Sequence, residues 1–380
     1  MANGRPLTIA IDASRAATGQ LTGTERYSRQ IIEAMIAAGR NHRYLLYLNQ
    51  AGPIDLALPA TARQRPIPFP RLWTHVRLSV EILRQPVDAL FIPAHVVPPV
   101  HPRATVVTIH DLGYLYEPDS HTAWSRRYLD WSTRWSVAMA RRIIAISGAT
   151  RDDLVRHYGA APEKIRVIPH GIDEGFHPLQ QDVVAREVRR LGFRQPYILF
   201  VGTIQPRKNV ARLIAAFDIL ADSNRELELV LAGKRGWLAE RIDAAIQSSR
   251  HRDRIRITGH VPDASLPALY NGAEAVVLPS LYEGFGLPAL EAMASGTPVV
   301  VSNRGALPGI AGDAALVVDP LSPQAIAAGL TAALDPATRA RRIEAGIQHA
   351  ARFRWTTAGQ QTLEVIEEAA GITRKAAHGQ

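Results

Sequence analysis

Two glutamates, Glu283 and Glu291, lie in residues 278–298, where sequence signals run in the order strand, loop, helix and helix stop. Pro288 suits the first position of a helix, where its missing N–H costs nothing, and Gly296 suits the end of that helix. Beside glycines, main-chain amides at a helix start can approach an anion closely, and the helix dipole favours that anion. We therefore expect a phosphate or a sugar to contact the amides of Gly284, Phe285, Gly286 and Leu287.

The two carboxylates are expected to have different roles, because Glu283 falls in the predicted loop and Glu291 in the predicted helix. A carboxylate can accept two hydrogen bonds at once, which suits the hydroxyls of a hexose and those of a ribose. The alternative is an acidic loop followed by an ordinary helix. The flanking glycines favour the binding interpretation.

A basic pair, Arg207 and Lys208, follows a predicted strand at 197–201 and precedes an apolar-periodic helix at 210–220. Pro206 restricts the backbone just before the pair. Cations are unfavourable at the start of a helix, which prefers anions, so a bound diphosphate would compensate their charge. The alternative is a solvated basic turn without a ligand.

In the first half of the chain, His110 and Asp111 follow a predicted strand at 105–109. A glycine-containing turn at 19–26 follows the first predicted strand, and its amides could approach an oxyanion near a helix that starts at Thr24. Ligands of open α/β sheets bind at the carboxyl ends of strands, so both places are candidate binding positions. The alternatives are a structural histidine and a flexible turn with a helix cap.

Short β-branched runs alternate with longer helical patterns, which is typical of βαβ units and parallel sheets. We predict an α/β protein with two doubly wound sheets, in domains at 1–170 and 171–354, because 380 residues suffice for two cores. Residues 169–173 and a polar stretch to Arg194 form the predicted linker, and a final helix within 355–380 can pack on either domain. The predicted strands are 7–11, 43–48, 89–92, 105–109, 143–146, 165–168, 197–201, 228–232, 254–258, 275–278, 298–302 and 315–318.

Positive charge is concentrated in the first half of the chain. The whole chain has 44 basic and 35 acidic residues, and residues 1–170 have 21 and 13, a surplus of eight. Such a field attracts anionic lipid headgroups or acidic polymers. No nucleic-acid-binding signature accompanies it, so nucleic acid is not an expected partner. Residues 68–85 mix apolar and basic positions, which favours either an interfacial helix or an amphipathic helix packed on the sheet.

Several kinds of chemistry are excluded by composition. The chain has no cysteine, which rules out disulfides, thiolate metal sites and cysteine nucleophiles. No Asp-x-Asp pair occurs, so a metal bridge to a diphosphate has no obvious ligands. The start lacks the apolar core of a secretory signal, and no run of 18 apolar residues could span a bilayer. We therefore expect a cytoplasmic protein that needs neither a metal nor another cofactor.

These motifs together resemble the family 4 glycosyltransferases, a group of retaining enzymes with the GT-B fold. The resemblance implies two Rossmann-like domains that face each other across a cleft, with the acceptor on the first domain and a nucleotide sugar on the second. It covers most of the chain, and the segment with two glutamates is its most specific part. The matching motifs are 19–23, His110-Asp111, 144–147, 167–173, 201–209, 259–263 and 278–298.

On the donor side, the resemblance assigns Glu283 to the hydroxyls of the donor sugar and Glu291 to the ribose. Lys208 corresponds to the lysine on the diphosphate, with Arg207 beside it. Many relatives carry their phosphate-binding arginine directly after the glycine, where this chain has Thr203. That departure leaves the share of Arg207 in phosphate binding open.

Other positions are assigned in the same way. His110 resembles the histidine beside the transferred sugar, and Asp111 lies on the acceptor side. Gly23 corresponds to a glycine that gives its amide to the diphosphate, and Val261 to a residue that flanks the base through its main chain. With His110, the groups expected to act on the reacting sugar are Glu283, Arg207 and Lys208.

The resemblance implies retention of configuration by front-side attack, with the leaving diphosphate taking the proton. It is strongest to bacterial mannosyltransferases of O-antigen and exopolysaccharide assembly. The expected donor is therefore GDP-mannose, and the expected acceptor is a lipid-linked saccharide at the inner face of an anionic membrane. The alternatives are a rhamnosyl or glucosyl donor, another GT-B enzyme such as an epimerase or phosphorylase, and a non-catalytic nucleotide-sugar-binding protein.

Overall fold

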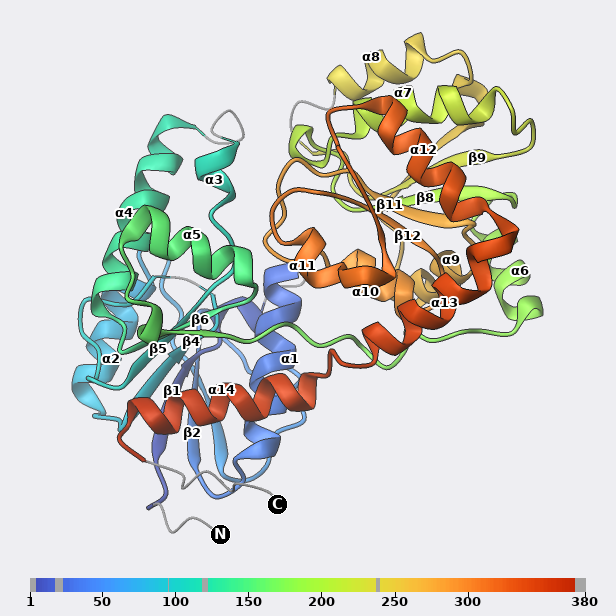
Figure 1. Cartoon of the computed structure of the whole chain (residues 1–380). Helices are drawn as coiled ribbons and strands as arrows, with labels where there is room; N and C mark the ends of the chain where they lie inside the picture. Colours follow the sequence, from blue (N-terminus) through green and yellow to red (C-terminus); the bar gives the residue numbers. More distant parts are fainter. Residues whose placement is uncertain (1–4, 18–22, 95, 118–121, 237–239, 373–380) are drawn as a thin grey trace. The chain divides into compact units, whose positions relative to one another are not determined.

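A computed structural model describes residues 5–17, 23–94, 96–117, 122–236 and 240–372. The chain divides into two compact units (Figure 1). Unit 1 comprises Met1–Leu112, His121–Gly171 and Arg354–Gln380, and unit 2 comprises Gly113–Ser120 and Ile172–Phe353. The chain thus leaves unit 1 after Gly171 and returns to it at Arg354.

Unit 1 is built on a seven-stranded sheet in the order β3-β2-β1-β4-β5-β6-β7, with all neighbouring strands parallel. Its inner strands bury nearly every side chain, as expected for a parallel sheet covered on both faces. The strands are β1 (Thr8–Asp12), β2 (Arg43–Leu48), β3 (Ala62–Pro66), β4 (Ala89–Ile92), β5 (Thr105–Ile109), β6 (Arg142–Ala145) and β7 (Ile165–Val167).

Unit 2 is built on a six-stranded sheet in the order β10-β9-β8-β11-β12-β13, again with parallel neighbours. The strands are β8 (Tyr197–Val201), β9 (Glu228–Ala232), β10 (Ile255–Gly259), β11 (Ala275–Leu278), β12 (Val299–Ser302) and β13 (Leu316–Val318). Both sheets have the strand order of a Rossmann fold, in which the order reverses beside the first strand. The predicted fold class, two doubly wound Rossmann-like domains, is confirmed.

Helices connect successive strands and cover the sheets (Figure 1). In unit 1 they are α1 (Gly23–Ala38), α2 (Ser79–Arg84), α4 (Ala123–Met139), α5 (Gly148–Tyr158) and α14 (Trp355–Ala369). In unit 2 they are α3 (Gly113–Tyr116), α6 (Gln181–Arg190), α7 (Val210–Ala221), α8 (Glu240–Ser248), α9 (Leu266–Asn271), α10 (Leu287–Ala294), α11 (Leu307–Ala311), α12 (Pro323–Leu334) and α13 (Pro336–Ala350).

Twelve strands were predicted, and each lies within a residue of a strand in the structure. The exception among the observed strands is β3, which no pattern predicted. Its sequence, ARQRP, is polar, and its residues alternate between partly buried and exposed at the edge of the sheet. Edge strands tolerate such polar sequences because one side of the backbone has no partner strand.

The predicted linker is only partly a linker. The polar stretch that was expected to extend to Arg194 contains α6, whose Val184 and Val188 are buried in unit 2. This helix was missed because only two apolar residues mark its inner face. The returning helix, α14, packs along α1 in unit 1. A Cβ added to Gly359 of α14 would lie 2.4 Å from the carbonyl carbon of Ala34, so the two backbones approach very closely.

Residues 68–85 form a short π-helical turn, η2 (Thr74–Leu78), followed by α2. Trp73, Leu78 and Ile82 are buried, as expected for packing on the sheet. Leu72 and Leu83, in contrast, are 64% and 65% exposed. The segment thus combines features of both predicted alternatives. None of the helices in the described part of the chain is long and apolar enough to cross a membrane.

Candidate active site

Three of the predicted donor residues lie where the strand order of unit 2 reverses, between β8 and β11. The carboxyl ends of two neighbouring strands diverge at such a point, which leaves room for a ligand. The loop after β8 carries Arg207 and Lys208, and the loop after β11 carries Glu283. The structure therefore brings these three side chains together although the two loops are about 75 residues apart in sequence.

Glu283 is the centre of this cluster and is only 7% exposed. Its Oε1 accepts hydrogen bonds from Nζ of Lys208 at 2.5 Å and from Oγ of Ser280 at 2.7 Å. Its Oε2 accepts one from the guanidinium of Arg207 at 3.1 Å, and that guanidinium also donates to the carbonyl of Tyr282 at 2.7 Å. Both carboxylate oxygens are thus held by charged donors.

The charge of Glu283 is strongly stabilised. Burial alone would raise the pKa of its carboxyl, but the nearby charges of Lys208 and Arg207 outweigh burial and lower the pKa to about 2. Hydrogen bonds from Lys208 and Ser280 act in the same direction. Glu283 is therefore a carboxylate at neutral pH, able to accept hydrogen bonds from hydroxyls but not to donate a proton.

The helix predicted at 210–220 is α7, and the basic pair precedes it, as expected. Arg207 and Lys208 belong to a separate turn, η5 (Pro206–Lys208), and Asn209 divides this turn from α7. Asn209 has a left-handed backbone with φ of 60°, a conformation that asparagine tolerates better than most residues. The two cations are compensated by Glu283 of the same unit, rather than only by an external anion as the sequence suggested.

Asn209 also fixes the position of the basic turn. Its buried side-chain amide donates to the carbonyls of Pro279 at 3.0 Å and Pro320 at 2.7 Å, which follow β11 and β13. The amide of Leu281 donates to the carbonyl of Arg207 at 2.9 Å. Three loops at the same edge of the sheet are therefore tied together, and the cations are held opposite Glu283. No local pattern in the sequence indicated this role of Asn209.

The backbone on the other side of Glu283 is held by the turn before α11. The amide of Ala306 donates to the carbonyl of Glu283 at 2.9 Å. Gly305 has φ of 58°, and a Cβ there would lie 2.6 Å from the same carbonyl oxygen. Ser302 donates to the carbonyl of Ser280 at 2.6 Å. A glycine is required at position 305 because of both its backbone conformation and this close approach.

The helix predicted after the second loop is α10, and its eight residues match the expected length of about two turns. Gly286 caps it with φ of 108°, which suits only glycine. Gly284 and Phe285 are buried, and Leu287 is half-buried at the helix start. Phe285 packs edge to face against Phe353, with ring centroids 6.3 Å apart, which fixes the loop against the end of unit 2.

Glu291 lies inside α10 and is 5% exposed. Its Oε2 accepts a hydrogen bond of 2.8 Å from the hydroxyl of Tyr270 in α9. Val261, in the loop after β10, is buried, and Thr203 is exposed in the loop after β8. These predicted donor residues, Glu291, Val261 and Thr203, belong to unit 2, as the Glu283 cluster does.

In unit 1, His110 follows β5 as predicted. Its Nε2 lies 2.9 Å from the carbonyl of Pro93, so this nitrogen carries the proton and donates. Burial lowers the pKa of His110 below its usual value, which favours the neutral ring at pH 7. In that tautomer Nδ1 is a hydrogen-bond acceptor. The carbonyl of His110 accepts from Thr150 at 3.1 Å, which ties the residue to the start of α5.

An aromatic cluster supports His110. The ring of Tyr27 meets it edge to face with centroids 4.8 Å apart, and the hydroxyl of Tyr27 is 3.1 Å from that of Thr108. His170 lies 4.6 Å from Tyr27 and stacks with Trp355 at 5.8 Å. His170 and Trp355 lie next to Gly171 and Arg354, two of the places where the chain passes from one unit to the other. His170 lies in the motif at 167–173, but no local pattern in the sequence indicated a role for it.

The other predicted positions of unit 1 are at the surface. Asp111 is exposed, next to His110. Gly23 is the first residue of α1, one residue before the predicted helix start, and a Cβ there would meet open space. The rest of the predicted glycine turn, residues 19–22, lies outside the described residues. Within the described ranges, no group of three or more His, Asp or Glu side chains could hold a metal ion.

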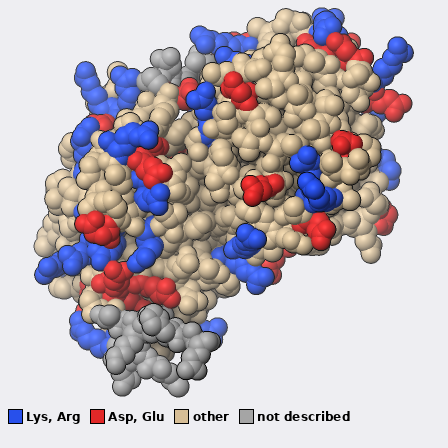
Figure 2. Space-filling model, in the orientation of Figure 1, with Lys and Arg blue, Asp and Glu red and all other residues tan. Residues whose placement is uncertain are grey.

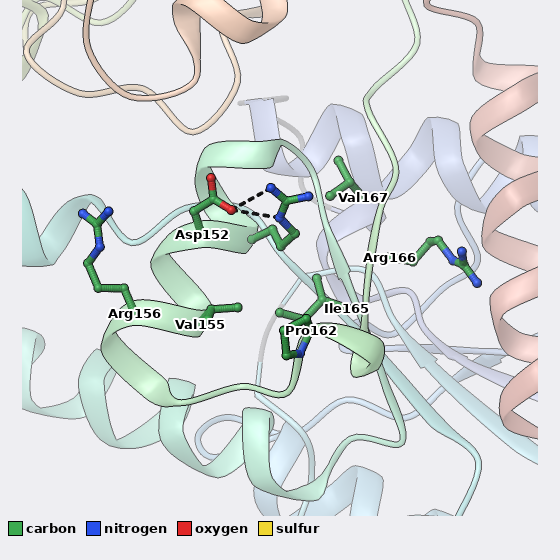
Figure 3. Close-up of a pocket in the computed structure, with 8 residues that line it drawn as sticks. Asp152, Val155, Arg156, Pro162, Ile165, Arg166 and Val167 are labelled. Carbon is green, nitrogen blue, oxygen red and sulfur yellow. Dashed lines mark hydrogen bonds and ion pairs between the residues drawn. The ribbon is translucent and has the colours of Figure 1, made fainter.

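A surface hollow of about 700 Å³ lies elsewhere in unit 1, along α5 and β7. It has three arginines, but Arg156 and Arg166 point away from each other, and Arg151 pairs with Asp152 at 2.7 Å (Figure 3). Arg166 lies 3.4 Å from the carboxylate of Glu368. The arginines therefore do not converge on one anion, and the lining includes none of the predicted site residues.

Two family models match the chain, one in each half. The model described as Glycosyltransferase Family 4 matches residues 21–176, and the model described as Glycosyl transferases group 1 matches residues 185–349. A curated relative, O-antigen chain mannosyltransferase B of Escherichia coli, is 31% identical over 91% of this chain and 96% of its own length. The match therefore extends over both units.

Solved structures share the fold at lower identity. Sucrose-phosphate synthase from Thermosynechococcus elongatus superposes with a TM-score of 0.77 and 23% identity, over 96% of this chain and all of its own. Anabaena HepE in complex with UDP-glucose superposes with a TM-score of 0.71 and 17% identity, over 95% of this chain and all of its own.

Proposed function

Because the chain belongs to the family 4 glycosyltransferases, we propose that it is a retaining enzyme that moves a hexose from a nucleotide sugar to a saccharide acceptor. The observation that carries this proposal is the arrangement of Lys208, Arg207 and Glu283 at the strand-order reversal of unit 2. Cations suit the diphosphate of the donor, and a permanently charged carboxylate suits the hydroxyls of its sugar. Unit 2 is then the donor-binding unit and unit 1 the acceptor-binding unit.

Lys208 and Arg207 are assigned to the diphosphate. Negative charge grows on this leaving group as the bond to the sugar breaks, and cations held in advance stabilise that charge. Asn209 and the carbonyl of Tyr282 hold the pair in place. The amides of residues 284–287, at the start of α10, would add donors to the same group. A divalent metal is not required in this scheme, because the two side chains supply the positive charge.

Glu283 is assigned to the hydroxyls of the donor sugar. Because its carboxyl stays ionised at neutral pH, it orients the sugar by accepting hydrogen bonds. The acceptor hydroxyl attacks from the side of the leaving group, and the diphosphate takes its proton. Retention follows from attack on that face. His110, neutral and with Nδ1 as an acceptor, is assigned to a hydroxyl of the transferred sugar.

Glu291 is assigned to the ribose and Val261 to the base. The hydrogen bond from Tyr270 fixes one oxygen of Glu291 and so orients the carboxylate. Gly23 is assigned to the diphosphate through its amide, and Asp111 to the acceptor side.

We assign mannose and GDP-mannose as the donor because of the likeness to O-antigen chain mannosyltransferase B, which extends over nearly the whole chain. The structure of HepE with UDP-glucose supports a nucleotide sugar in general and makes a glucosyl donor the first alternative. The proposed acceptor is a lipid-linked saccharide of a surface polysaccharide, used by a cytoplasmic enzyme at the inner face of the membrane.

A thermal-shift series tests the donor. The protein is melted in EDTA with GDP, UDP, dTDP and ADP and with their sugar conjugates, since a tight ligand raises the melting temperature. We expect a shift with GDP and GDP-mannose and none in Arg207→Ala. The matched control is Arg252→Ala, an exposed arginine in a surface turn of unit 2, which should shift like the wild type.

The outcomes separate the alternatives. A shift with UDP-glucose alone would replace the donor and leave the transferase proposal standing. No shift with any nucleotide would overturn the donor site. Consumption of the nucleotide sugar without transfer to any acceptor would favour an epimerase, and tight binding without consumption would favour a binding protein. Retention is read from the anomeric configuration of the product by NMR.

A further inference from the structure

One face of α4 carries aromatic side chains that unit 1 does not cover. They are spaced by four, three and four residues, which places them along one side of the helix. Trp124 is 76% exposed and Trp131 is 49% exposed, while the rings between and after them are half-buried. The four residues are Trp124, Tyr128, Trp131 and Trp135. Large exposed aromatic side chains that are grouped in this way mark an interaction surface.

The rings stack on one another. Trp124 and Tyr128 have planes 2° apart and centroids 5.9 Å apart, and Trp131 and Trp135 have planes 14° apart at 6.3 Å. Their faces are therefore partly covered by each other. A sugar ring binds an aromatic residue by lying flat on an open face, so this stack is poorly suited to a saccharide chain. An indole edge, with its apolar body and polar N–H, suits the interface between lipid and water.

The turn η2 extends the same surface. His75 stacks on Trp131 with planes 16° apart and centroids 6.1 Å apart. Burial lowers the pKa of His75, which favours its uncharged form among these rings. Nearby in sequence, Val76 is 43% exposed, and Leu72 is exposed although its φ of 54° is rare for leucine. We call this surface, made of Leu72, His75, Val76, Trp124, Tyr128 and Trp131, the aromatic face.

The segments that carry the aromatic face are basic. Residues 68–85 and 123–139 together contain six arginines and two acidic residues. Both acidic residues are paired, Glu81 with Arg77 at 2.8 Å and Asp130 with Arg134 at 3.0 Å. Figure 2 shows basic and acidic side chains scattered over the surface that it displays, most of which belongs to other residues. The other four arginines of these two segments are exposed, namely Arg71, Arg84, Arg126 and Arg127.

From this combination we propose that the aromatic face docks on the surface of an anionic bilayer. The tryptophans would enter the headgroup region, and the arginines would attract the anionic headgroups. A second copy of the chain fits less well, because a symmetric contact would bring the same arginines against each other. Docking does not depend on the reaction at Glu283, so this proposal can fail while the proposed transfer activity stands.

Flotation of the full chain with vesicles tests the proposal. Vesicles of phosphatidylglycerol and phosphatidylethanolamine are compared with vesicles of phosphatidylcholine alone. We expect the protein to float with the anionic vesicles at 0.1 M salt, at least tenfold more than with the neutral ones, and to be released at 0.5 M salt. Tryptophan fluorescence should shift to the blue on binding.

The variants are Trp124→Ser and the double variant Trp124→Ser with Trp131→Ser. Trp124 is mostly exposed and Trp131 is about half exposed, so the melting temperature of both variants should equal that of the wild type. We expect about a tenfold loss of vesicle binding in the single variant and more in the double variant. The matched control is Leu321→Ser, a 50% exposed apolar residue of unit 2, which should float like the wild type.

Three results would overturn the proposal. The wild type could stay off anionic vesicles, or the double variant could float as well as the wild type. Sedimentation could also show that the wild type is a dimer and the double variant a monomer, in which case the aromatic face is a contact between two copies. GDP binding, measured on the same samples, reports separately on the donor site.

Discussion

Nζ of Lys208 lies 2.5 Å from Oε1 of Glu283, and the guanidinium of Arg207 donates to the other carboxylate oxygen at 3.1 Å. The carboxylate thus holds the same two cations that the proposed reaction assigns to the diphosphate. An anion that enters this place competes with Glu283 for them. The cluster is therefore arranged so that diphosphate binding would free the carboxylate for the hydroxyls of the sugar.

Replacing Glu283 by glutamine should separate binding from transfer. Glu283→Gln removes the competing charge and keeps the shape, so we expect the Kd for GDP to fall about three- to tenfold. Transfer should fall at least a hundredfold, because the sugar loses a charged acceptor for its hydroxyls. Calorimetry with GDP and a single-turnover transfer assay measure the two effects. Equal losses in both would contradict the assigned role.

Acid should reveal the same ion pair. The pKa of Glu283 in the folded protein, about 2, is below its ordinary value of 4.5, so its contribution to stability is complete above pH 4.5 and is lost as the pH falls toward 2. At pH 3 we expect the wild type to lose about 2 kcal/mol from this group, and Glu283→Gln to lose none of it. Urea unfolding at pH 7 and pH 3 gives both free energies. A stability difference that is the same at the two pH values would argue against the lowered pKa.

Asn209 should contribute to donor binding without contacting the donor. Asn209→Gly keeps the left-handed backbone but leaves the carbonyls of Pro279 and Pro320 without their donor. We expect this loss to lower the free energy of unfolding by about 1–3 kcal/mol. We expect KM for the nucleotide sugar to rise severalfold. Asn209→Ala should be worse, because alanine also resists a φ of 60°. The comparison of the two variants by urea unfolding and steady-state kinetics separates the hydrogen bonds from the backbone. Wild-type KM in both would contradict the role.

The parts of the fold with strong local patterns were predicted from the sequence, and the parts set by distant contacts were not. The buried strands β8 and β11 are apolar runs between turn signals, so their bounds followed directly. The edge strand β3 is polar and depends on pairing with β2. The residues of the donor cluster were expected near ligands because of their chemistry. Their mutual pairing, and the link from Asn209 to Pro320, join segments that no local pattern connects.

The packing of Gly171 on Trp355 inside unit 1 should be sensitive to a single methyl group. A Cβ on Gly171 would lie 2.2 Å from the backbone nitrogen of Trp355, and backbone cannot move aside as a side-chain end can. We expect Gly171→Ala to destabilise unit 1 by about 3 kcal/mol through overpacking, with a melting temperature lower by several degrees. Because Trp355 stacks on His170, and the rings of His170 and His110 are 5.9 Å apart, kcat should fall as well.

The matched control for this variant is Gly175→Ala, four residues further along, where an added Cβ meets nothing within 4 Å. Its melting temperature and kcat should equal those of the wild type. Calorimetry measures the melting temperature, and steady-state kinetics measures kcat, for the wild type and both variants. If Gly171→Ala has the melting temperature of the control, the backbone of unit 1 at Gly171 can adjust, and the close packing of Gly171 on Trp355 does not hold the cluster around His110 in place.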